Sequence, residues 1–291
     1  MSDEPMQDWK RAKGAFGVIL GPPTLWLGLF FVVPMAIIWA YSFGRTDGLI
    51  GIEISGTLAN YARILDPLYL AIFLKSIWFA ALTTALCLLI GFPLALVITF
   101  ASPRGKSLLL LAVMLPFWTN LLIRTYALMA VLRTEGYANT VLGWFGAGPL
   151  PLLHNNFAII LGLVYVNLPF MVLPLYAALD RLDRSLMEAS LDLGAGHLRT
   201  IRDIVVPLAM PGILSGLLIT FIPALGSYLT PDLLGGPDGQ MIASVIERQF
   251  KRANDWPFGA ALSFVLMYAT FFMIAAQGLF ARRRRAARGA A

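Results

Sequence analysis

The segment between residues 180 and 207 holds the most regularly spaced candidate functional residues of this 291-residue chain. The run Ser185-Leu-Met-Glu188 fits a capping box, in which the two polar side chains satisfy free backbone amides at the start of a helix. Gly194 follows, and glycine readily adopts the left-handed conformation that ends a helix. A second short helix can begin near His197 and run into the membrane. The spacing predicts a small helix–turn–helix whose glycines allow another backbone to approach closely.

This segment also matches a known signature. The EAA signature of ABC importer permeases reads Glu-Ala-Ala, three residues, Gly, nine residues, Ile-x-Leu-Pro. The matching residues here are Glu188, Ala189, Ser190, Gly194, Ile204 and Pro207. Ser190 replaces the third alanine, and Val206 replaces the leucine. The resemblance implies that the loop docks into a groove on an ATPase and couples it to the membrane helices. The alternative is that Glu188 only caps a helix and Gly194 only ends it, which leaves the full spacing unexplained.

The resemblance extends from about Asn60 onward and is most similar to the permease chains of spermidine/putrescine importers. The runs that carry it are 65-LDPLY-69, 116-PFWTN-120, 161-LGLVY-165, 168-LPFMV-172, 233-LLGGPD-238 and 255-DWPFG-259. This resemblance implies a type I ABC importer permease fold in the bacterial inner membrane. It also implies several partners: a second permease subunit, two ATPase subunits that bind ATP and magnesium, and a periplasmic substrate-binding protein.

Composition shows independently that the elements carrying this loop lie in a membrane. The chain is 58% hydrophobic and only 13% charged, with a mean hydropathy of +0.75. Soluble domains carry about 25% charged residues. A membrane-spanning helix needs about 20 largely apolar residues. Six runs qualify: Ala15 to Phe43, Leu70 to Phe100, Ser107 to Leu132, Phe157 to Leu179, Ile204 to Tyr228 and Phe258 to Phe280. We predict an all-α, polytopic, six-helix protein.

Lysine and arginine residues set the predicted orientation, because they concentrate in cytoplasmic loops. Fourteen fall on the side of the two termini and six on the other, so both termini are predicted to be cytoplasmic. The predicted layout is a cytoplasmic segment at 1–14, a permease domain at 15–280 and a basic tail at 281–291. Within the domain, 180–207 is the coupling loop and 229–257 a periplasmic segment. The basic tail is expected to bind membrane lipid rather than nucleic acid.

The chain lacks the sequence of a nucleotide-binding loop. Such a loop needs a glycine, then four residues, then Gly-Lys-Ser or Gly-Lys-Thr, and Phe100 occupies the position of the first glycine ahead of Gly105-Lys-Ser107. The two histidines, His154 and His197, are predicted on opposite sides of the membrane and cannot form one metal or acid–base site. The lone Cys87 lies in an apolar run. We therefore expect a transporter subunit that has no cofactor or catalytic site of its own.

The solute pathway is predicted from polar residues within the spans, because such residues are costly in a bilayer. Lys75 could reach the headgroups. Asn120 and Arg124 are four residues apart and are expected to share a helix face, which could line the pathway or pack between helices. The pathway candidates are Trp118, Asn120, Arg124, Tyr165, Asn167, Tyr228 and Asp232. The six spans contain no Asp or Glu, so the acidic candidates for recognising a cationic solute lie only near their outer ends: Glu135, Asp232, Asp238, Glu247 and Asp255.

Several functions stay open at this point. Polyamine is the favoured solute, with other small amines, amino-acid-like compounds and opines as alternatives. A secondary transporter would be expected to show internal repeats and carboxylates at mid-membrane, and the sequence shows neither. A membrane-embedded enzyme would need clustered histidine, cysteine or carboxylate side chains. The outer segment after Gly235-Gly236 is expected to form an amphipathic helix through Ile242, Val245, Ile246 and Phe250.

Overall fold

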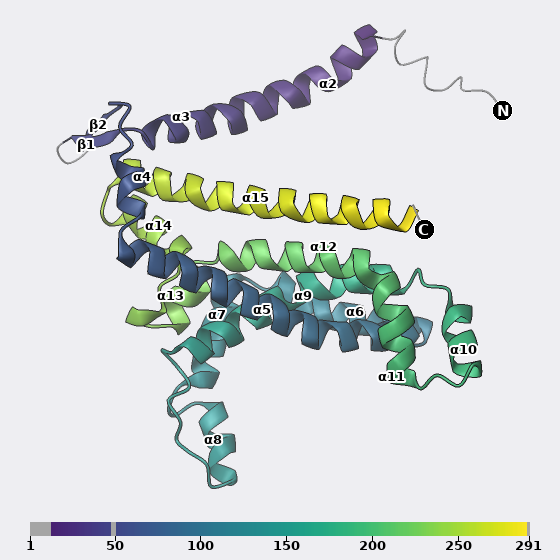
Figure 1. Cartoon of the computed structure of the whole chain (residues 1–291). Helices are drawn as coiled ribbons and strands as arrows, with labels where there is room; N and C mark the ends of the chain where they lie inside the picture. Colours follow the sequence, from purple (N-terminus) through teal and green to yellow (C-terminus); the bar gives the residue numbers. More distant parts are fainter. Residues whose placement is uncertain (1–12, 48–50, 290–291) are drawn as a thin grey trace. The chain divides into compact units, whose positions relative to one another are not determined.

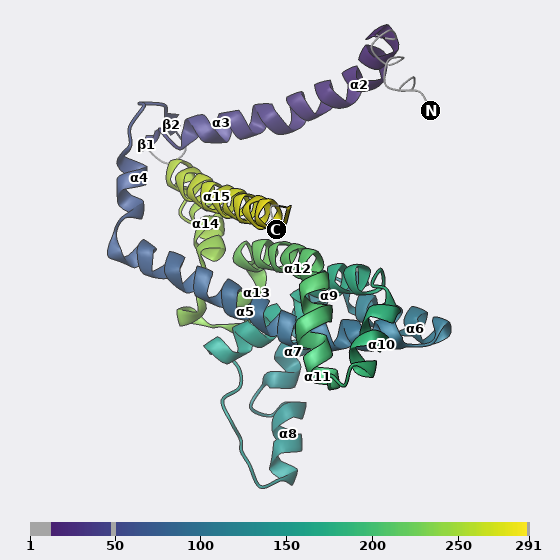
Figure 2. The same ribbon diagram turned by 45° about the vertical axis from the view of Figure 1, so that its right-hand side comes forward.

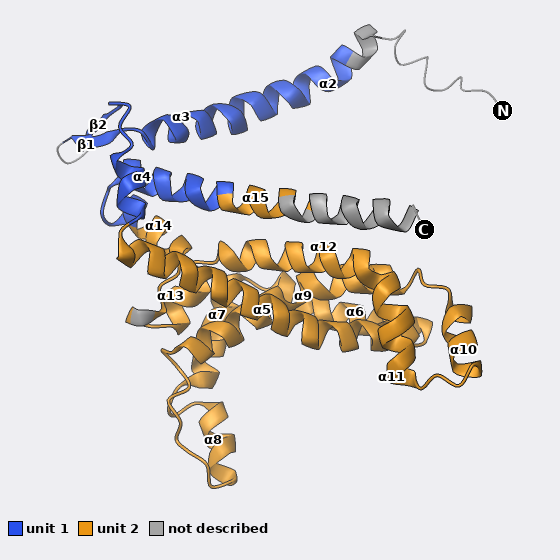
Figure 3. Ribbon diagram, viewed as in Figure 1, with its two compact units in different colours: residues 1–65, 249–268 blue, residues 66–248, 269–291 orange. Residues whose placement is uncertain are grey.

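The computed structural model describes the backbone of residues 13–47 and 51–289, and most of it is helical (Figure 1). The predicted segment 1–14 falls almost entirely outside the described residues. The side chains of the basic tail at 281–291 also fall outside them. The chain forms two compact units (Figure 3). Unit 1 combines residues 1–65 with 249–268, and unit 2 combines residues 66–248 with 269–291.

Five helical stretches are long and apolar enough to cross a membrane. They are Gly17–Tyr41, Pro67–Phe100, Asn156–Leu179, His197–Leu225 and Trp256–Ala275. A sixth span results if the pair Pro103–Trp118 and Leu121–Trp144, bent by 96°, crosses the membrane together. Five of the predicted spans therefore correspond to helices, whereas the third, predicted as the single run Ser107 to Leu132, is interrupted.

Unit 1 begins with a helix that contains one wide turn. Its elements are α2 (Lys13–Leu27), the π turn η2 (Gly28–Val32), α3 (Val33–Tyr41), strands β1 (Arg45–Asp47) and β2 (Gly51–Glu53), and α4 (Ala59–Ile64). The two strands pair antiparallel, with Thr46 opposite Ile52. The π turn immediately precedes Val33-Pro34, where proline has no amide to continue the α-helical ladder, and the Val33 amide donates to the Gly28 carbonyl instead.

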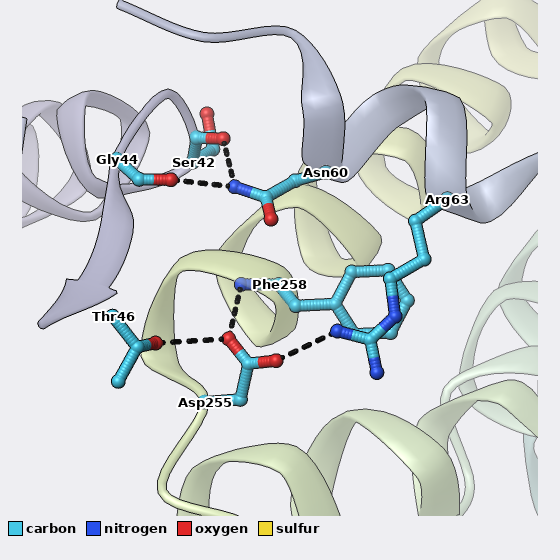
Figure 4. Close-up of polar contacts among 7 residues, drawn as sticks. All are labelled: Ser42, Gly44, Thr46, Asn60, Arg63, Asp255 and Phe258. Carbon is cyan, nitrogen blue, oxygen red and sulfur yellow. Dashed lines mark hydrogen bonds and ion pairs between the residues drawn. The ribbon is translucent and has the colours of Figure 1, made fainter. Parts of the chain in front are cut away.

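A polar network holds the non-helical part of unit 1 together (Figure 4). The Asp255 carboxylate accepts hydrogen bonds from Thr46 Oγ1 at 3.3 Å and Arg63 Nη1 at 2.8 Å. The Arg63 guanidinium also stacks 3.9 Å above the centre of the Phe258 ring. Asn60 Nδ2 donates to two backbone carbonyls of the segment that leaves α3. Asp255, one of the outer carboxylates considered for cation recognition, is therefore occupied by an arginine of its own chain.

Unit 2 is built around three long helices. α5 (Pro67–Phe100), α9 (Asn156–Leu179) and α12 (Val206–Leu225) pack along one another, and their shared core includes Met171 and Leu175. A Cβ atom at Gly212 would lie 2.8 Å from the Pro174 carbonyl oxygen, so glycine is needed where α12 crosses α9. Close approach at small residues is how helices associate in membranes, where lipid is as apolar as the helices themselves.

The remaining elements of unit 2 connect or follow these helices in the chain. They are α6 (Pro103–Trp118), α7 (Leu121–Leu132), α8 (Tyr137–Trp144), α10 (Arg184–Asp192), α11 (His197–Thr200), the π turn η3 (Ile201–Val205), α13 (Leu229–Leu234), η4 (Pro237–Gly239) and most of α14 (Ile242–Lys251). α14 and α15 (Trp256–Gly289) each contribute residues to both units. α14 confirms the amphipathic helix predicted after the glycine pair, and its Ile242 amide donates to Ser76 Oγ.

Candidate functional site

The first arm of the predicted coupling loop is α10, and its N-cap lies two residues earlier than expected. Asp183 is the N-cap, and its carboxylate accepts a hydrogen bond from the Ser185 amide at 3.0 Å. This bond lowers the pKa of Asp183. The predicted capping box between Ser185 and Glu188 is therefore wrong. Asp is as strong an N-cap as Ser, and Asp183 already satisfies the amide of the residue that was expected to be the cap.

Gly194 terminates α10, as predicted, because it follows the C-cap residue Leu193. Its φ of +84° is in the left-handed region. The Gly194 amide donates to the Leu191 carbonyl, and the Ala195 amide donates to the Ser190 carbonyl. These two bonds are the pattern of a Schellman motif, which satisfies the last free carbonyls of a helix. The turn is therefore fixed by the backbone alone.

The two arms of the hairpin are joined to each other and to the helix bundle. Ser190 Oγ lies 3.0 Å from Thr200 Oγ1 on α11, and Thr200 is buried. Met187 and Leu182 pack against the core formed by α5, α9 and α12. Ser190 thus has a definite role at the position where the signature usually has alanine. The hairpin projects from one end of the long helices of unit 2 (Figures 1 and 2).

Polar contacts fix the base of the hairpin to the ends of the long helices. Lys106 Nζ, at the start of α6, lies 2.5 Å from the Asp180 carboxylate at the end of α9. The lysine donates a hydrogen bond to this carboxylate and lowers the pKa of Asp180. Arg184 donates to the Thr99 carbonyl at 3.2 Å, and its guanidinium lies above the ring of Phe100. A displacement of the hairpin would therefore be transmitted to α5, α6 and α9.

The outer side of the hairpin leaves the signature residues exposed. Glu188, Ala189 and Gly194 are all exposed, and Glu188 makes no hydrogen bond or ion pair with any described residue. Two leucines beside the turn, Leu193 and Leu198, are 88% and 84% exposed. The sequence interpretation missed these leucines, although two apolar side chains around a predicted exposed glycine turn would have been a signal. This surface combines a free carboxylate, a glycine turn and apolar side chains, which suits protein docking.

The end of the signature forms the junction between the hairpin and α12. Ile204 lies in the π turn η3, and the Val206 amide donates to the Ile201 carbonyl five residues earlier. Pro207 follows directly and has no amide to donate. η2 precedes Pro34 with the same spacing, so in both helices the wide turn accommodates the proline. Helical structure continues from His197 to Leu225, which confirms that the second arm runs into the fifth span.

The third predicted span contains the first group of pathway candidates. α6 ends at Trp118 and α7 begins at Leu121. Asn120 is the N-cap of α7, and its side chain accepts from the Leu122 amide at 2.8 Å. Asn120 therefore lies at the start of a helix and not within one, one turn before Arg124, whose amide donates to the Asn120 carbonyl at 3.1 Å. An Asn N-cap was a readable signal, but the long apolar run around it concealed the helix start.

The buried Arg124 side chain satisfies free backbone carbonyls at the break between α6 and α7. It is only 7% exposed, and its Nη2 donates to the carbonyls of Thr119 at 2.9 Å and Phe117 at 3.3 Å. The guanidinium lies 5.9 Å from the centre of the Tyr165 ring on α9. Its Nε is buried without a hydrogen-bond partner among the described residues. A cation is favoured at the C-terminus of a helix, where carbonyls are free, so the arginine stabilises the end of α6.

The remaining pathway candidates of the third and fourth spans differ in exposure. Trp118 is 74% exposed at the break, and Tyr165 is 41% exposed. Asn167 is buried in α9, and its amide donates to the Leu163 carbonyl one turn earlier. The structure therefore brings Arg124 and Tyr165 together beside Trp118 and Asn120. It places Asn167 within helix packing.

Tyr228 and Asp232 lie beyond the fifth span, around α13. Tyr228 precedes α13, and its carbonyl accepts from Ser244 Oγ on α14. The Asp232 carboxylate pairs with Arg248 of α14 at 2.6 Å. The sequence interpretation did not identify Arg248 as a partner because the two residues are sixteen positions apart across a loop. This second group is separate in the chain from the Arg124 group.

Comparison with known proteins identifies relatives over most of the chain. The model of the family described as "binding-protein-dependent transport system inner membrane component" matches residues 13–286. The chain is 42% identical over 251 residues to the spermidine/putrescine transport system permease protein PotB of Escherichia coli K12, covering 86% of this chain and 91% of that protein. It is 33% identical over 267 residues to the E. coli inner membrane ABC transporter permease protein YdcU, covering 87% and 85%.

Solved structures share the fold. A chain of a bacterial alginate ABC transporter, in complex with an alginate pentasaccharide-bound periplasmic protein, matches with a TM-score of 0.76 and 19% identity. The match covers 95% of this chain and 96% of that one. A chain of an amino acid ABC transporter matches with a TM-score of 0.52 and 18% identity, over 78% of this chain and 96% of that one. The fold is that of ABC importer permeases.

Proposed function

The chain belongs to the family of binding-protein-dependent transport system inner membrane components, and from this premise we propose that it forms half of the membrane pathway of a spermidine/putrescine importer. The carrying observation is the hairpin at residues 180–207, with its exposed Glu188 and Gly194. The polyamine assignment is supported by the 42% identity to a permease named for spermidine and putrescine.

In this proposal the hairpin is the site at which an ATPase subunit docks. Closure of two ATPase subunits on ATP and magnesium would push on α10 and α11. The bonds of Lys106 to Asp180 and of Arg184 to Thr99 would carry that displacement to the ends of α5, α6 and α9. α12 would move with the hairpin, because helical structure continues from α11 into it. A second permease subunit would supply the other half of the pathway.

In this proposal a periplasmic binding protein, and not the permease, selects the substrate. A polyamine is a cation, and its recognition calls for free carboxylates or aromatic faces. Two of the outer carboxylates are already paired within the chain, Asp232 with Arg248 and Asp255 with Arg63. The buried cation in the third span, Arg124, does not favour a cationic solute. A permease of this kind passes a solute that another protein has selected.

The test of the solute is ATP-driven uptake of labelled spermidine by proteoliposomes that contain this chain with its neighbouring permease, ATPase and binding protein. We expect uptake to require ATP and to be competed by putrescine. ATP-dependent uptake that amino acids or opines compete for, and polyamines do not, would support the ABC importer mechanism and refute the assignment of polyamine as the solute. Uptake without ATP would refute the ABC mechanism itself.

The test of the docking site uses two carboxylates of α10. Glu188→Gln is expected to lower uptake at least about tenfold and to weaken ATPase co-purification, because a buried docking contact to a charged group is worth roughly 1.5–3 kcal/mol. Asp192→Asn removes a charge from the same exposed helix but lies outside the signature, and should have little effect. Equal losses in both variants would indicate a general charge effect and not a specific contact at Glu188.

A further inference from the structure

α8 lies in a segment whose composition is unusual for a loop between membrane spans. Residues 136–153 contain no charged side chain. In soluble proteins about a quarter of residues are charged, so a water-exposed segment of this length would be expected to contain several. In both views α8 projects away from the packed helices α5, α9 and α12 of the same unit (Figures 1 and 2).

One face of α8 is apolar, aromatic and exposed. Tyr137, Trp144 and Phe145 are 77%, 78% and 81% exposed, and Val141 is 45% exposed. Val141, Trp144 and Phe145 follow Tyr137 by four, seven and eight residues, so a helix of 3.6 residues per turn places all four on one side. Three large aromatic rings are therefore presented together, and they are not part of the packed core of unit 2.

The other side of α8 fixes the helix to the end of α7. The buried Asn139 donates to the carbonyls of Arg133 and Leu150 and accepts from the Leu150 amide. Gly136 lies so close to the last turn of α7 that an added Cβ would be 2.6 Å from the Ala130 and Val131 carbonyl oxygens. The aromatic face is thus held at a set position beside a membrane helix.

We propose that α8 is an interfacial helix that inserts its aromatic face into the lipid headgroup region at the end of the third span. Tyrosine and tryptophan are enriched at the two membrane–water interfaces, where their rings meet acyl chains and their polar atoms meet water. The preceding helix α7 also has exposed apolar side chains, with Ile123 68% and Tyr126 55% exposed. A surface for a soluble protein would be expected to have a polar, charged rim, and residues 136–153 provide no charge for one.

The test compares two reporter sites on this helix. Val141→Cys lies within the aromatic face, and Gly143→Cys lies on the opposite side with open space around it. Each is made in a Cys87→Ala background, labelled with the fluorophore NBD, and reconstituted as the complete transporter in vesicles containing lipids with a shallow doxyl quencher. We expect quenching at position 141 to exceed that at 143 by at least about threefold, with no change when substrate-loaded binding protein is added.

Three results would overturn the proposal. Equal quenching at the two positions would show that the face is not inserted in lipid. Loss of quenching at position 141 on addition of the binding protein would make the face a protein-docking surface. Protection of position 141 by the second permease in the assembled complex would make it a subunit interface. These readouts are independent of the transported solute, so failure of the proposed polyamine specificity would leave this inference intact.

A second variant tests the role of the rings themselves. Trp144→Ser with Phe145→Ser, in the Val141→Cys protein, is expected to lower the quenching of the label at least about twofold, while binding-protein-stimulated ATPase activity persists. Unchanged quenching would show that the rings do not anchor the helix. Should the double variant fail to assemble, the comparison of positions 141 and 143 in the parent protein still decides the question.

Discussion

The coupling hairpin and the break between α6 and α7 both leave backbone groups free at helix ends, and the two regions satisfy them differently. In the hairpin the partners are local: Asp183 accepts from Ser185, and Gly194 donates to Leu191. In the break, the buried Arg124 reaches back from the next helix to the Thr119 carbonyl. Local, exposed bonds leave side chains available for a partner protein. A buried bond makes the shape of the span depend on one residue.

This difference predicts which changes affect stability as well as transport. The largest effect is expected for Arg124→Met, which leaves the carbonyls of Phe117 and Thr119 without their charged donor. Hydrogen bonds to charged groups contribute about 1.5–3 kcal/mol each, so we expect a destabilisation of a few kcal/mol and loss of most uptake. Thermal unfolding of the purified complex and ATP-driven uptake would measure both.

Arg124→Lys is the matched control for that prediction. Lysine keeps the charge but lacks the planar fork of nitrogen donors, so it should recover part of the stability and less of the transport. An unchanged melting temperature in Arg124→Met would show that the break is held by other contacts, and the contrast between the two regions would then be lost.

The second effect is confined to the hairpin. Gly194 has φ +84°, whereas Gly196 has φ −71°, which any residue can adopt. Gly194→Ala forces a side chain into the left-handed region at a cost of about 1–2 kcal/mol. Neither glycine has atoms within 4 Å of an added Cβ, so conformation alone separates the two sites. We expect uptake to fall about fivefold or more in Gly194→Ala and to stay near normal in Gly196→Ala.

The membrane core should be unaffected in either glycine variant. The turn is exposed, so the melting temperature of the purified complex should not change, in contrast to Arg124→Met. Equal uptake by the two alanine variants would show that the left-handed turn is not required for coupling. A common fall in melting temperature would show that the hairpin and the core unfold together.

Much of the fold could be predicted because each relevant signal comes from residues that are close together in the sequence. Five spans follow from runs of apolar residues, and the turn at Gly194 follows from glycine itself. The helix start at Asp183 was missed by two residues because several cap residues occur in succession there. The polar pairs Ser190–Thr200 and Asp232–Arg248 join different helices, and single-sequence spacing gives no measure of such distances.

The break in the third span shows a different limit. Hydropathy averages over a window, and the run from Ser107 to Leu132 is apolar on both sides of Thr119-Asn120. The 96° bend depends on Asn120 capping the second half and on Arg124 capping the first. The sequence pattern marked both residues as unusual within a membrane span. Their actual role, satisfying backbone groups at a bend, requires the three-dimensional structure.

A smaller effect is expected at the start of the hairpin. Asp183→Ala removes the N-cap of α10, which should fray its first turn and lower uptake about twofold. Asp183→Asn keeps an accepting oxygen at the same position and should transport normally. Helix capping by side chains is a local effect, so neither variant should alter the melting temperature. Equal loss in both variants would indicate that the charge of Asp183, and not its cap, is what the ATPase requires.

The smallest effect is expected at the base of the hairpin, where Lys106 lowers the pKa of Asp180. A carboxylate whose pKa is lowered on folding stabilises the folded state above its ordinary pKa of 3.8, and this contribution disappears as pH falls through the lowered value. Both partners are partly exposed, so the pair should contribute less than about 1 kcal/mol at pH 7.

Lys106→Met should therefore lower stability slightly at pH 7 and not at all at an acidic pH low enough to protonate the parent Asp180 carboxylate. Denaturant unfolding at the two pH values, with Asp180→Asn and the double variant completing the cycle, would measure this coupling. A coupling that persists at low pH would not be an ion pair. One well above 1 kcal/mol would place a strong contact in the hairpin, and its stability would then resemble that of the buried break.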